Sequence, residues 1–378
     1  MDNMLANYST KNENTFEVNT SQPSNGSLET NSSHCDNVTI SEYQFSLIPV
    51  VYSLIFIIGF TGNSIVVTIL YKCIGLKTVA SIYIFNLAIA DLVCLASLPL
   101  WAVYYALNYD WIFGSVMCKI CGFLFPLNIY ASIFFITCMS MDRYLAIVYP
   151  FLSQRRRNVC QARFVSVAVW LLACCSSIPA IYFRETRYLE NLRVTACIMN
   201  LPEENNVWFA GLALMKNTLG FLIPLTMMGI CYIRIGVHLM KPQALENNRN
   251  QNRDHILLML IAVVVVFFTC WLPFHILTFL DALISINVIT SCDLKNTIDP
   301  LLMYAICLAL SNSCINPFLY YFIGKDFKTE FRRLSSDKMA SSLGSRRSST
   351  TRYSSFSRKG SDARDAVIHA NCIKVGES

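Results

Sequence analysis

Seven long runs of apolar residues divide the chain, and short polar segments separate them. Each run exceeds the roughly 20 residues that an α-helix needs to cross about 30 Å of hydrocarbon. An outer-membrane barrel has alternating segments of about ten residues, which these runs do not match. The pattern therefore predicts an all-α membrane protein, a bundle of seven transmembrane helices. The runs are 46–71, 78–106, 116–148, 162–183, 207–240, 255–286 and 298–323.

The composition supports a membrane protein. Of the 378 residues, 54% are apolar and only 14% are charged, whereas about a quarter of a soluble domain is charged. A soluble enzyme is therefore almost excluded. The hydropathy divides the chain into a polar segment 1–45, the bundle 46–323, a short amphipathic segment 324–335 and a disordered tail 336–378. Residues 1–45 show no signal-peptide pattern, so we expect the first run to act as its own insertion signal.

The distribution of positive charge predicts the orientation in the membrane. The amino-terminal segment and the loops on its side carry five Lys and Arg residues, whereas the opposite side and the tail carry 22. Cytoplasmic segments are the ones enriched in these residues. We therefore predict a multi-pass plasma-membrane protein with an extracellular amino terminus and a cytoplasmic carboxyl terminus. Five Asn-x-Ser/Thr glycosylation acceptors agree with this: Asn7, Asn19, Asn25, Asn31 and Asn37.

Only four of the sixteen cysteines lie clearly on the predicted outer side, three of them in outer segments and Cys118 at the outer start of the third run. Disulfides form in such an oxidising compartment, and four cysteines allow three pairings. We favour Cys118 with Cys197 and Cys35 with Cys292. No HExxH or histidine-rich spacing indicates a metal site, and the CxxC formed by Cys118 and Cys121 has no second pair.

A charged side chain inside hydrocarbon costs roughly 2.5–3.5 kcal/mol, so each one is a candidate functional residue. Asp91 lies in the middle of the second run. Carboxylate, amide and hydroxyl oxygens suit a small hard cation such as sodium, and we expect no other cofactor. The alternative is a protonated aspartic acid that packs through hydrogen bonds. The predicted sodium site consists of Asp91, Asn128, Ser132, Asn312 and Asn316.

A second group of intramembrane charges ends the third run, in the tripeptide Asp142-Arg143-Tyr144. The Arg143 side chain can extend to water or pair with the adjacent carboxylate, and an exchange of partner would act as a switch. Prolines inside the later runs remove helical hydrogen bonds and kink the helices. Pro273 in the sixth run would form such a hinge.

Each run contains one marker, and the set of markers resembles that of the rhodopsin-like G-protein-coupled receptors. The markers are Asn63, Asp91, Asp142-Arg143-Tyr144, Trp170, Pro224, the stretch 270–273 and the stretch 316–320. The resemblance covers about residues 45–335. It implies an outward swing of the inner half of the sixth helix, and G proteins or arrestin-like proteins as cytoplasmic partners. The implied switch residues are Asp142, Arg143, Tyr144, Trp271, Pro273, Asn316, Pro317 and Tyr320.

Lys216 lies about 13 Å into the fifth run, and no acid occupies the same run. A ligand carboxylate would be a suitable partner, with Arg184 as a second cation capable of bidentate binding. The alternatives are an ammonium that extends into a water-filled vestibule for Lys216, and a loop salt bridge for Arg184. Asp281 and Asp299 offer negative charge at the outer ends of the last two runs. For Asp299, an N-cap before Pro300 is an equal alternative.

Several local stretches resemble the angiotensin II receptor family, and its type 2 branch more than its type 1 branch. They are residues 81–91, 98–105, 130–140, 211–217 and 271–281. The resemblance implies that Lys216 and Arg184 hold the terminal carboxylate of angiotensin II, and that Asp281 and Asp299 hold its arginine. Another short peptide with both groups is the alternative ligand. The implied aromatic contacts are Tyr52, Trp101, Tyr104, Tyr105, Trp271 and Phe274.

The segment after the seventh run has Phe327, Phe331 and Leu334 at helical spacing, with cations between them. This pattern predicts a helix that lies on membrane lipid at the inner leaflet. The type 2 branch implies that this helix covers the transducer surface, so that G-protein coupling is weak. Basic motifs make Ser335, Ser348 and Ser349 candidate phosphorylation sites that would recruit arrestin-like proteins. A solvated polybasic tail is the alternative.

Two rival functions fit the sequence less well. A transporter is expected to show an internal repeat with broken helices in matching positions, which seven runs do not offer. An intramembrane hydrolase needs a nucleophile beside a base, and neither Ser64 nor His275 occurs in such a motif. We therefore predict no catalytic residues and no nucleic-acid partner.

Overall fold

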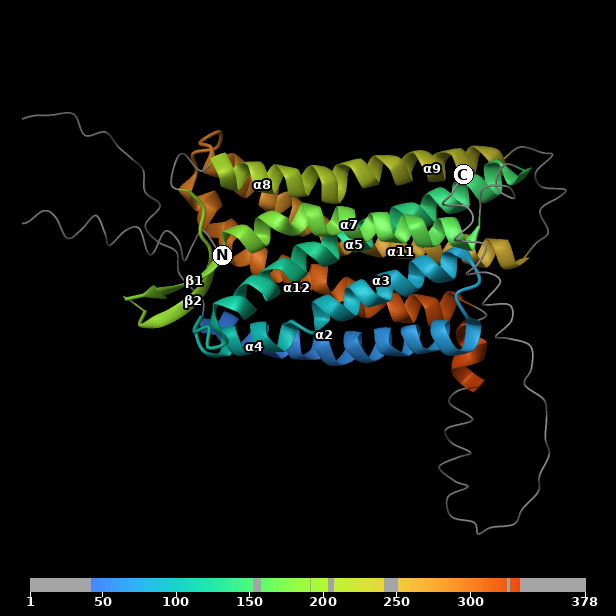
Figure 1. The fold of residues 1–378 in the computed structure, drawn as a ribbon. Helices are drawn as coiled ribbons and strands as arrows, with labels where there is room; N and C mark the ends of the chain where they lie inside the picture. The colour runs from blue at the N-terminus through green and yellow to red at the C-terminus, as the bar shows by residue number, and fades with distance from the viewer. Residues whose placement is uncertain are drawn as a thin grey trace, which may run out of the picture.

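The computed structural model describes residues 42–151, 158–190, 192–202, 207–240, 251–324 and 327–333. Seven helices in this part of the chain are long and apolar enough to cross a membrane, so the prediction of a seven-helix bundle is confirmed (Figure 1). Six of the seven spans begin and end within about three residues of the predicted runs. The seventh starts five residues early, at Asp293 instead of residue 298.

Several spans are divided into two or three helical pieces. The first is α2 (Glu42–Thr68) followed by the π-helical turn η1 (Ile69–Ile74), and the second is α3 (Val79–Leu95) with α4 (Leu98–Ala106). The fifth consists of α8 (Val207–Asn217), the π-helical turn η2 (Thr218–Leu222) and α9 (Ile223–Leu239). The remaining spans are the single helices α5 (Gly114–Val148), α7 (Val159–Phe183), α11 (Gln251–Ser285) and α12 (Cys292–Ile323).

Local sequence explains where these helices start and break. The side chains of Thr78, Asn158 and Ser291 each accept a hydrogen bond from the backbone N–H three residues later, which caps α3, α7 and α12. Pro224 has no N–H to donate, and the wider turn η2 lies directly before it. Ser291 is thus the N-cap of α12, and the alternative that Asp299 caps this helix is wrong.

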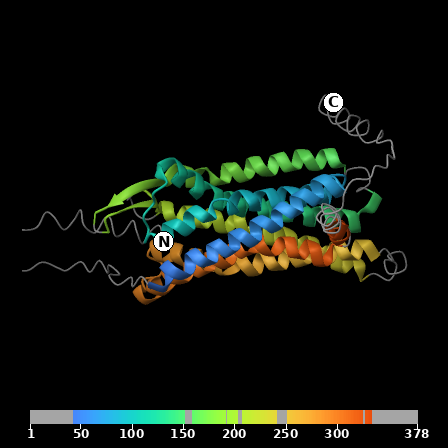
Figure 2. The ribbon, with the colours of Figure 1, turned by 90° about the horizontal axis from the view of Figure 1, so that it is seen from below.

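The helix α5 is at the centre of the bundle and contacts α3, α7, α9 and α11. The helix α12 packs against both α11 and α2, and Figure 2 shows the blue first span beside the red-orange seventh span. Buried apolar side chains fill the space between these helices. The outward face of α7 is also apolar, with Phe164, Val167 and Leu171 each more than half exposed. Such a surface fits contact with lipid, since water would disfavour it.

Two antiparallel strands, β1 (Arg184–Leu189) and β2 (Val194–Met199), form a hairpin between the fourth and fifth spans. Residue 184 pairs with residue 199, and residue 189 with residue 194. The hydropathy pattern predicts only a loop in this segment. The hairpin projects from one end of the bundle (Figure 1), which we call the hairpin end.

At the opposite end, residues 327–333 form the predicted short helix after the seventh span. Phe327 is buried, and the centre of its ring lies 6.5 Å from that of the Tyr320 ring. The centre of the Phe331 ring lies 5.1 Å from that of the Tyr321 ring. These contacts hold the short helix against the end of α12. Leu334, the third apolar position of the predicted pattern, lies outside the described residues.

Candidate functional site

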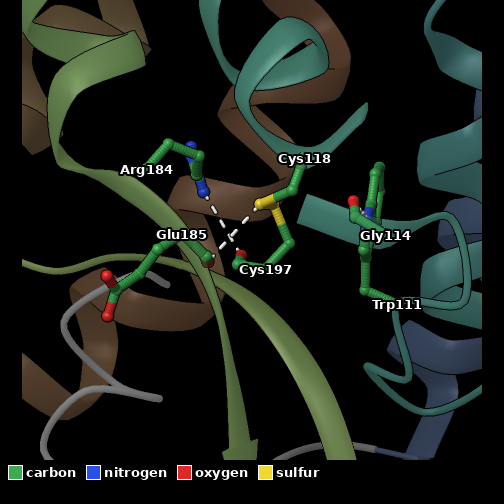
Figure 3. The surroundings of a disulfide bond; sticks show 6 residues. All are labelled: Trp111, Gly114, Cys118, Arg184, Glu185 and Cys197. Carbon is green, nitrogen blue, oxygen red and sulfur yellow. Dashed lines mark hydrogen bonds between the residues drawn. A yellow bond between two sulfur atoms is a disulfide. The ribbon is translucent and has the colours of Figure 1, made fainter. Parts of the chain in front are cut away.

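A disulfide joins the hairpin to the bundle. Cys118 in the first turns of α5 and Cys197 in β2 are bonded, with their Cα atoms 5.7 Å apart (Figure 3), so this predicted pairing is confirmed. Cys35 lies outside the described residues and Cys292 begins α12. Their pairing therefore stays a prediction.

Hydrogen bonds also tie the loop between the second and third spans to the hairpin. The backbone N–H of Trp111 donates to the carbonyl oxygen of Thr195 at 2.7 Å, and the N–H of Thr195 donates to Asp110 Oδ1 at 3.0 Å. In the same loop, burial raises the pKa of the Tyr109 hydroxyl to about 12, so it stays neutral in the physiological range. The loop and the hairpin thus form one connected cover at this end.

A cavity of about 210 Å³ lies between the hairpin end and the interior of the bundle. The predicted ligand contacts come together there from five elements, α2, α4, β1, α8 and α11. Tyr104, Trp271 and Asp299 do not line the cavity. The predicted contacts that line it are Tyr52, Trp101, Tyr105, Arg184, Lys216, Phe274 and Asp281.

Arg184 starts β1 and is buried against α5. Its Nη1 donates to the carbonyl oxygen of Cys197 at 3.3 Å, and its guanidinium carbon lies 5.7 Å from the centre of the Trp101 ring (Figure 3 shows the first contact). A Cβ atom added to Gly122 would lie 2.7 Å from Arg184 Nε. The absence of a side chain at Gly122 therefore makes room for Arg184 at the cavity wall.

Lys216 lies in the last turn of α8 and its side chain reaches the cavity. Its Nζ is 5.1 Å from the centre of the Phe274 ring, within the range of a cation–π interaction. The ammonium is therefore directed into the bundle instead of into lipid. Together Lys216 and Arg184 place two cations around one cavity.

Asp281 on α11 and Asp299 on α12 share Lys295, a loop cation whose pairing the sequence does not predict. The Nζ of Lys295 donates to Asp281 Oδ1 at 2.6 Å and to Asp299 Oδ1 at 3.0 Å. Both carboxylates are buried, with 3% of each residue exposed. The two acidic residues predicted to bind a ligand thus already contact a protein cation, and only Asp281 reaches the cavity.

The two remaining aromatic candidates, Tyr104 and Trp271, pack against side chains that line the cavity. Tyr104 is fully buried, and its ring lies 5.5–5.7 Å from those of Trp101, Tyr105, Tyr109 and Trp111. Trp271 is also buried and lies 5.8 Å from the ring of Phe274, which does line the cavity. Both act through neighbours that reach the cavity surface.

Some lining residues are not predicted by the sequence pattern. Met199 reaches the cavity because it pairs with Arg184 in a hairpin that was not predicted. The others are apolar or small residues on predicted helices, and helical spacing alone does not distinguish the cavity face from the core. They include Phe209, Leu212, Met215, Thr278 and Ile306.

The predicted sodium site forms a hydrogen-bonded group in the middle of the bundle. Asp91 is fully buried, its Oδ1 accepts from Asn128 Nδ2 at 3.0 Å and from Ser313 Oγ at 2.7 Å, and its Oδ2 accepts from Asn316 Nδ2 at 3.1 Å. The amide of Asn128 also donates to Ser132 Oγ at 3.3 Å.

Asn312 differs from the other members of this predicted site. Among the described residues, Ser313 rather than Asn312 donates to Asp91. The Oδ1 atoms of Asn312 and Asn316 are buried and accept no hydrogen bond within the described part of the chain. The Asp91 carboxylate and the amide oxygen of Asn316, whose Nδ2 contacts that carboxylate, are hard oxygen donors of the kind that fits a small cation.

At the opposite end of α5, Arg143 pairs with the adjacent carboxylate. Its Nε and Nη2 lie 3.1 and 2.5 Å from Asp142 Oδ2, and both residues are buried. Tyr144 is half-buried, with its ring 5.7 Å from that of Tyr149. Pro273 and Pro317 lie inside α11 and α12 as predicted. The glycosylation residues Asn7 to Asn37 and the serines 335, 348 and 349 lie outside the described residues.

The chain is similar to known receptors. A family model described as 7 transmembrane receptor (rhodopsin family) matches residues 62–320. The type-2 angiotensin II receptor of Ovis aries is 55% identical over 78% of this chain and 81% of its own length. The human type-2 receptor is 51% identical over 84% and 88%, and the human type-1 angiotensin II receptor is 42% identical over 79% and 83%.

Proposed function

The chain belongs to the rhodopsin family of seven-transmembrane receptors, among the angiotensin II receptors, and from this premise we propose that it is a cell-surface receptor for angiotensin II or a closely similar peptide. The single observation that carries the proposal is the cavity, in which Lys216 and Arg184 face the same space as Asp281. A ligand with a negative end and a positive group matches that arrangement. Because the chain belongs to a receptor family, we prefer the receptor function to the transporter and hydrolase alternatives.

The cations at the cavity suggest how the ligand is oriented. In the proposed complex, the terminal carboxylate of the peptide binds between Lys216 and Arg184, where burial strengthens charge-assisted hydrogen bonds. The arginine of the peptide points to Asp281, with Asp299 behind it. The apolar side chains of the peptide contact the aromatic lining formed by Tyr52, Trp101, Tyr105 and Phe274.

Binding of radiolabelled angiotensin II to cells that express the chain tests this proposal. We expect Lys216→Ala and Arg184→Ala each to weaken binding at least about tenfold, which is about 1.4 kcal/mol. A peptide whose terminal carboxylate is amidated should lose affinity for the unmodified receptor and respond little to either substitution. Arg187→Ala, which removes a cation three residues along the same strand, is the matched control. Normal binding by both cavity variants would contradict the proposed carboxylate site.

The proposed signal runs from the cavity to the opposite end through α11. Phe274 lines the cavity, packs on Trp271 and directly follows Pro273 in α11. A ligand that shifts Phe274 therefore acts directly on the hinge. The inner half of α11 would then swing away from the bundle, and the Asp142–Arg143 pair would exchange partners. Pro317 and Tyr320 lie on α12, which packs against α11 and would move with it.

We propose G proteins or arrestin-like proteins as the cytoplasmic partners. The helix 327–333 is held against the end of α12 by Phe327 and Phe331, which supports a role in limiting access to the transducer surface and weak G-protein coupling. Phosphorylation of Ser335, Ser348 or Ser349 would add negative charge for an arrestin-like partner. The part of Phe331 that stays exposed would contact inner-leaflet lipid beside this helix.

A sodium ion is proposed as an allosteric ligand near Asp91. The vacant Oδ1 atoms of Asn312 and Asn316, with the Asp91 carboxylate and the Ser132 hydroxyl, would supply hard oxygen ligands. When bound, the ion would add a positive charge that neutralises the buried carboxylate. Its expected effect is to favour the resting arrangement of the helices around it.

As a member of this family the chain is a multi-pass plasma-membrane protein. We propose that the hairpin end is extracellular, because the disulfide between Cys118 and Cys197 needs an oxidising compartment. Glycans on the amino-terminal sequons would lie on the same side. A protease-protection assay with tags at both ends of the chain tests this orientation.

A further inference from the structure

Lys295 lies one turn after the start of α12 and contacts two carboxylates at once. Its Nζ is 2.6 Å from Asp281 Oδ1 on the neighbouring helix α11 and 3.0 Å from Asp299 Oδ1, four residues further along α12. These distances are those of direct charge-assisted hydrogen bonds. The lysine therefore joins the hairpin ends of the sixth and seventh spans.

The three side chains do not balance in charge. One ammonium faces two carboxylates, and the exposed fractions of the side chains are 14% for Lys295, 4% for Asp281 and 3% for Asp299. The second oxygen of Asp299, Oδ2, is buried and accepts no hydrogen bond from the residues that the structure describes. A buried charge without a full set of partners is costly. The group therefore favours the arrival of a further cation.

A ligand can reach this group from the cavity through only one of its members. Asp281 lines the cavity, whereas neither Lys295 nor Asp299 does so. A cationic group of a ligand that enters the cavity would thus meet a carboxylate already occupied on Oδ1 by Lys295. The Lys295 ammonium and the cationic group of the ligand would thus compete for the same Asp281 carboxylate.

We propose that Lys295 is a resident counter-ion that competes with the cationic group of the ligand for Asp281 and Asp299, and so sets how strongly the receptor prefers a cationic ligand. This inference rests on the proposed peptide receptor function. A guanidinium binds a carboxylate through two hydrogen bonds, whereas an ammonium acts as a point charge on a flexible stem. Lys295 is thus a partner that an arginine of the ligand can outcompete, at a cost in affinity.

The test compares two peptides on membranes that contain the full chain. The first is angiotensin II and the second is the same peptide with citrulline in place of arginine, which keeps the shape and removes the charge. The readout is the ratio of the two dissociation constants, citrulline over arginine. We expect Lys295→Met to raise this ratio about tenfold over the unmodified receptor, because the acidic pair then has no resident cation.

Three further variants sharpen the test. Lys295→Arg keeps a cation in place and should leave the ratio at or below the unmodified value. Lys119→Met removes a positive charge from α5 at the same end of the bundle and should leave the ratio unchanged. If Lys295→Met does not reach the cell surface, Lys295→Gln takes its place, since it is also uncharged and keeps a polar end.

The outcomes separate this inference from the proposed function. A ratio that does not move in the uncharged variants, or an equal change in affinity for both peptides, would overturn the role of Lys295 while leaving the receptor assignment intact. An equal rise in the ratio with Lys119→Met would also overturn it, because the effect would then be one of overall charge. If the unmodified receptor binds neither peptide, the proposed peptide ligand is wrong, and so is the proposed competition between Lys295 and that ligand.

Discussion

Asp91 in the middle of the bundle and Asp281 at the hairpin end are both buried, but different kinds of partner stabilise their carboxylates. Asp91 accepts hydrogen bonds from three neutral side chains, Asn128, Ser313 and Asn316. Asp281 instead contacts the ammonium of Lys295, which it shares with Asp299.

The difference shows how one residue type can serve two purposes. The donors to Asp91 come from α5 and α12, so the carboxylate of α3 holds three helices in one arrangement. Each donor would be left without its acceptor if the carboxylate moved away. The ammonium beside Asp281 ends a flexible stem and already has a second acceptor in Asp299, so that it can be exchanged. We expect the first site to govern stability and the resting state, and the second to govern ligand choice.

The largest expected effect comes from loss of the carboxylate at the central site, with loss of the Asp281 carboxylate as the comparison. Asp91→Leu leaves two amides and a hydroxyl without their acceptor, at a cost on the order of 3 kcal/mol in the free energy of unfolding. Asp281→Leu leaves one ammonium facing one carboxylate, so we expect a much smaller change. Thermal unfolding of the purified receptor variants measures both. Equal falls in melting temperature would remove the distinction between the two sites.

The hairpin end should also be sensitive to the position of its charges. Gly122→Ala would place a Cβ against the Nε of Arg184 and displace the guanidinium from the cavity wall. We expect about a tenfold loss of affinity for a peptide with a free terminal carboxylate, equal to about 1.4 kcal/mol, and little change for its amide. Gly211→Ala is the control, because a Cβ there meets no atom within 4 Å. Equal binding by the Gly122 and Gly211 variants would show that this close contact does not position Arg184.

Sodium should act at the central site alone. The ion would favour the resting arrangement around Asp91 and lower the affinity for an activating peptide, on the order of fivefold. Asp91→Asn removes the negative charge and should abolish this effect, whereas Asp281→Asn should retain it. Competition binding in sodium chloride and in N-methylglucamine chloride at equal ionic strength measures the difference. A sodium effect that survives Asp91→Asn would place the ion elsewhere.

The smallest expected effect is that of ionic strength at the hairpin end. Salt screens interactions between charges that remain near solvent. Raising choline chloride from low to high concentration should weaken binding of the arginine peptide about twofold, and Asp281→Asn should reduce this dependence. Asp91→Asn should leave it unchanged, because Asp91, unlike Asp281, does not line the cavity that the ligand enters. Equal salt dependence in all three receptors would show that Asp281 does not contact the ligand cation.

The helices could be predicted from the sequence because a membrane-spanning helix is a local property. A continuous apolar stretch of sufficient length predicts a span whatever lies next to it, and the bounds of α7 and of the fifth span, Val207–Leu239, differ from the predicted runs by only a few residues. The pairing of Cys118 with Cys197 could also be predicted from the sequence, because few cysteines lie on the outer side of the membrane. The start of α12 was misjudged because its first turns are polar and extend beyond the apolar run.

The partners of the charged residues could not be predicted in the same way. Lys295 is one of several loop cations in the sequence, and its pairing with Asp281 depends on how α11 and α12 meet across a short turn. Ser313 donates to Asp91 while its neighbour Asn312 does not, because consecutive helical residues point in directions about 100° apart. The hairpin was missed because its short strands are stabilised mainly by each other and by the disulfide.

The sequence by itself determined the seven spans, the family and the charged residues that hydrocarbon makes costly, since each depends on composition along the chain or on local motifs. Only the tertiary structure decided which of those charges meet, which aromatic residues reach the cavity and which lie behind it. The physical reason is that hydrophobic transfer acts on each segment separately. Hydrogen bonds and ion pairs act over about 3 Å between residues that lie far apart in the chain.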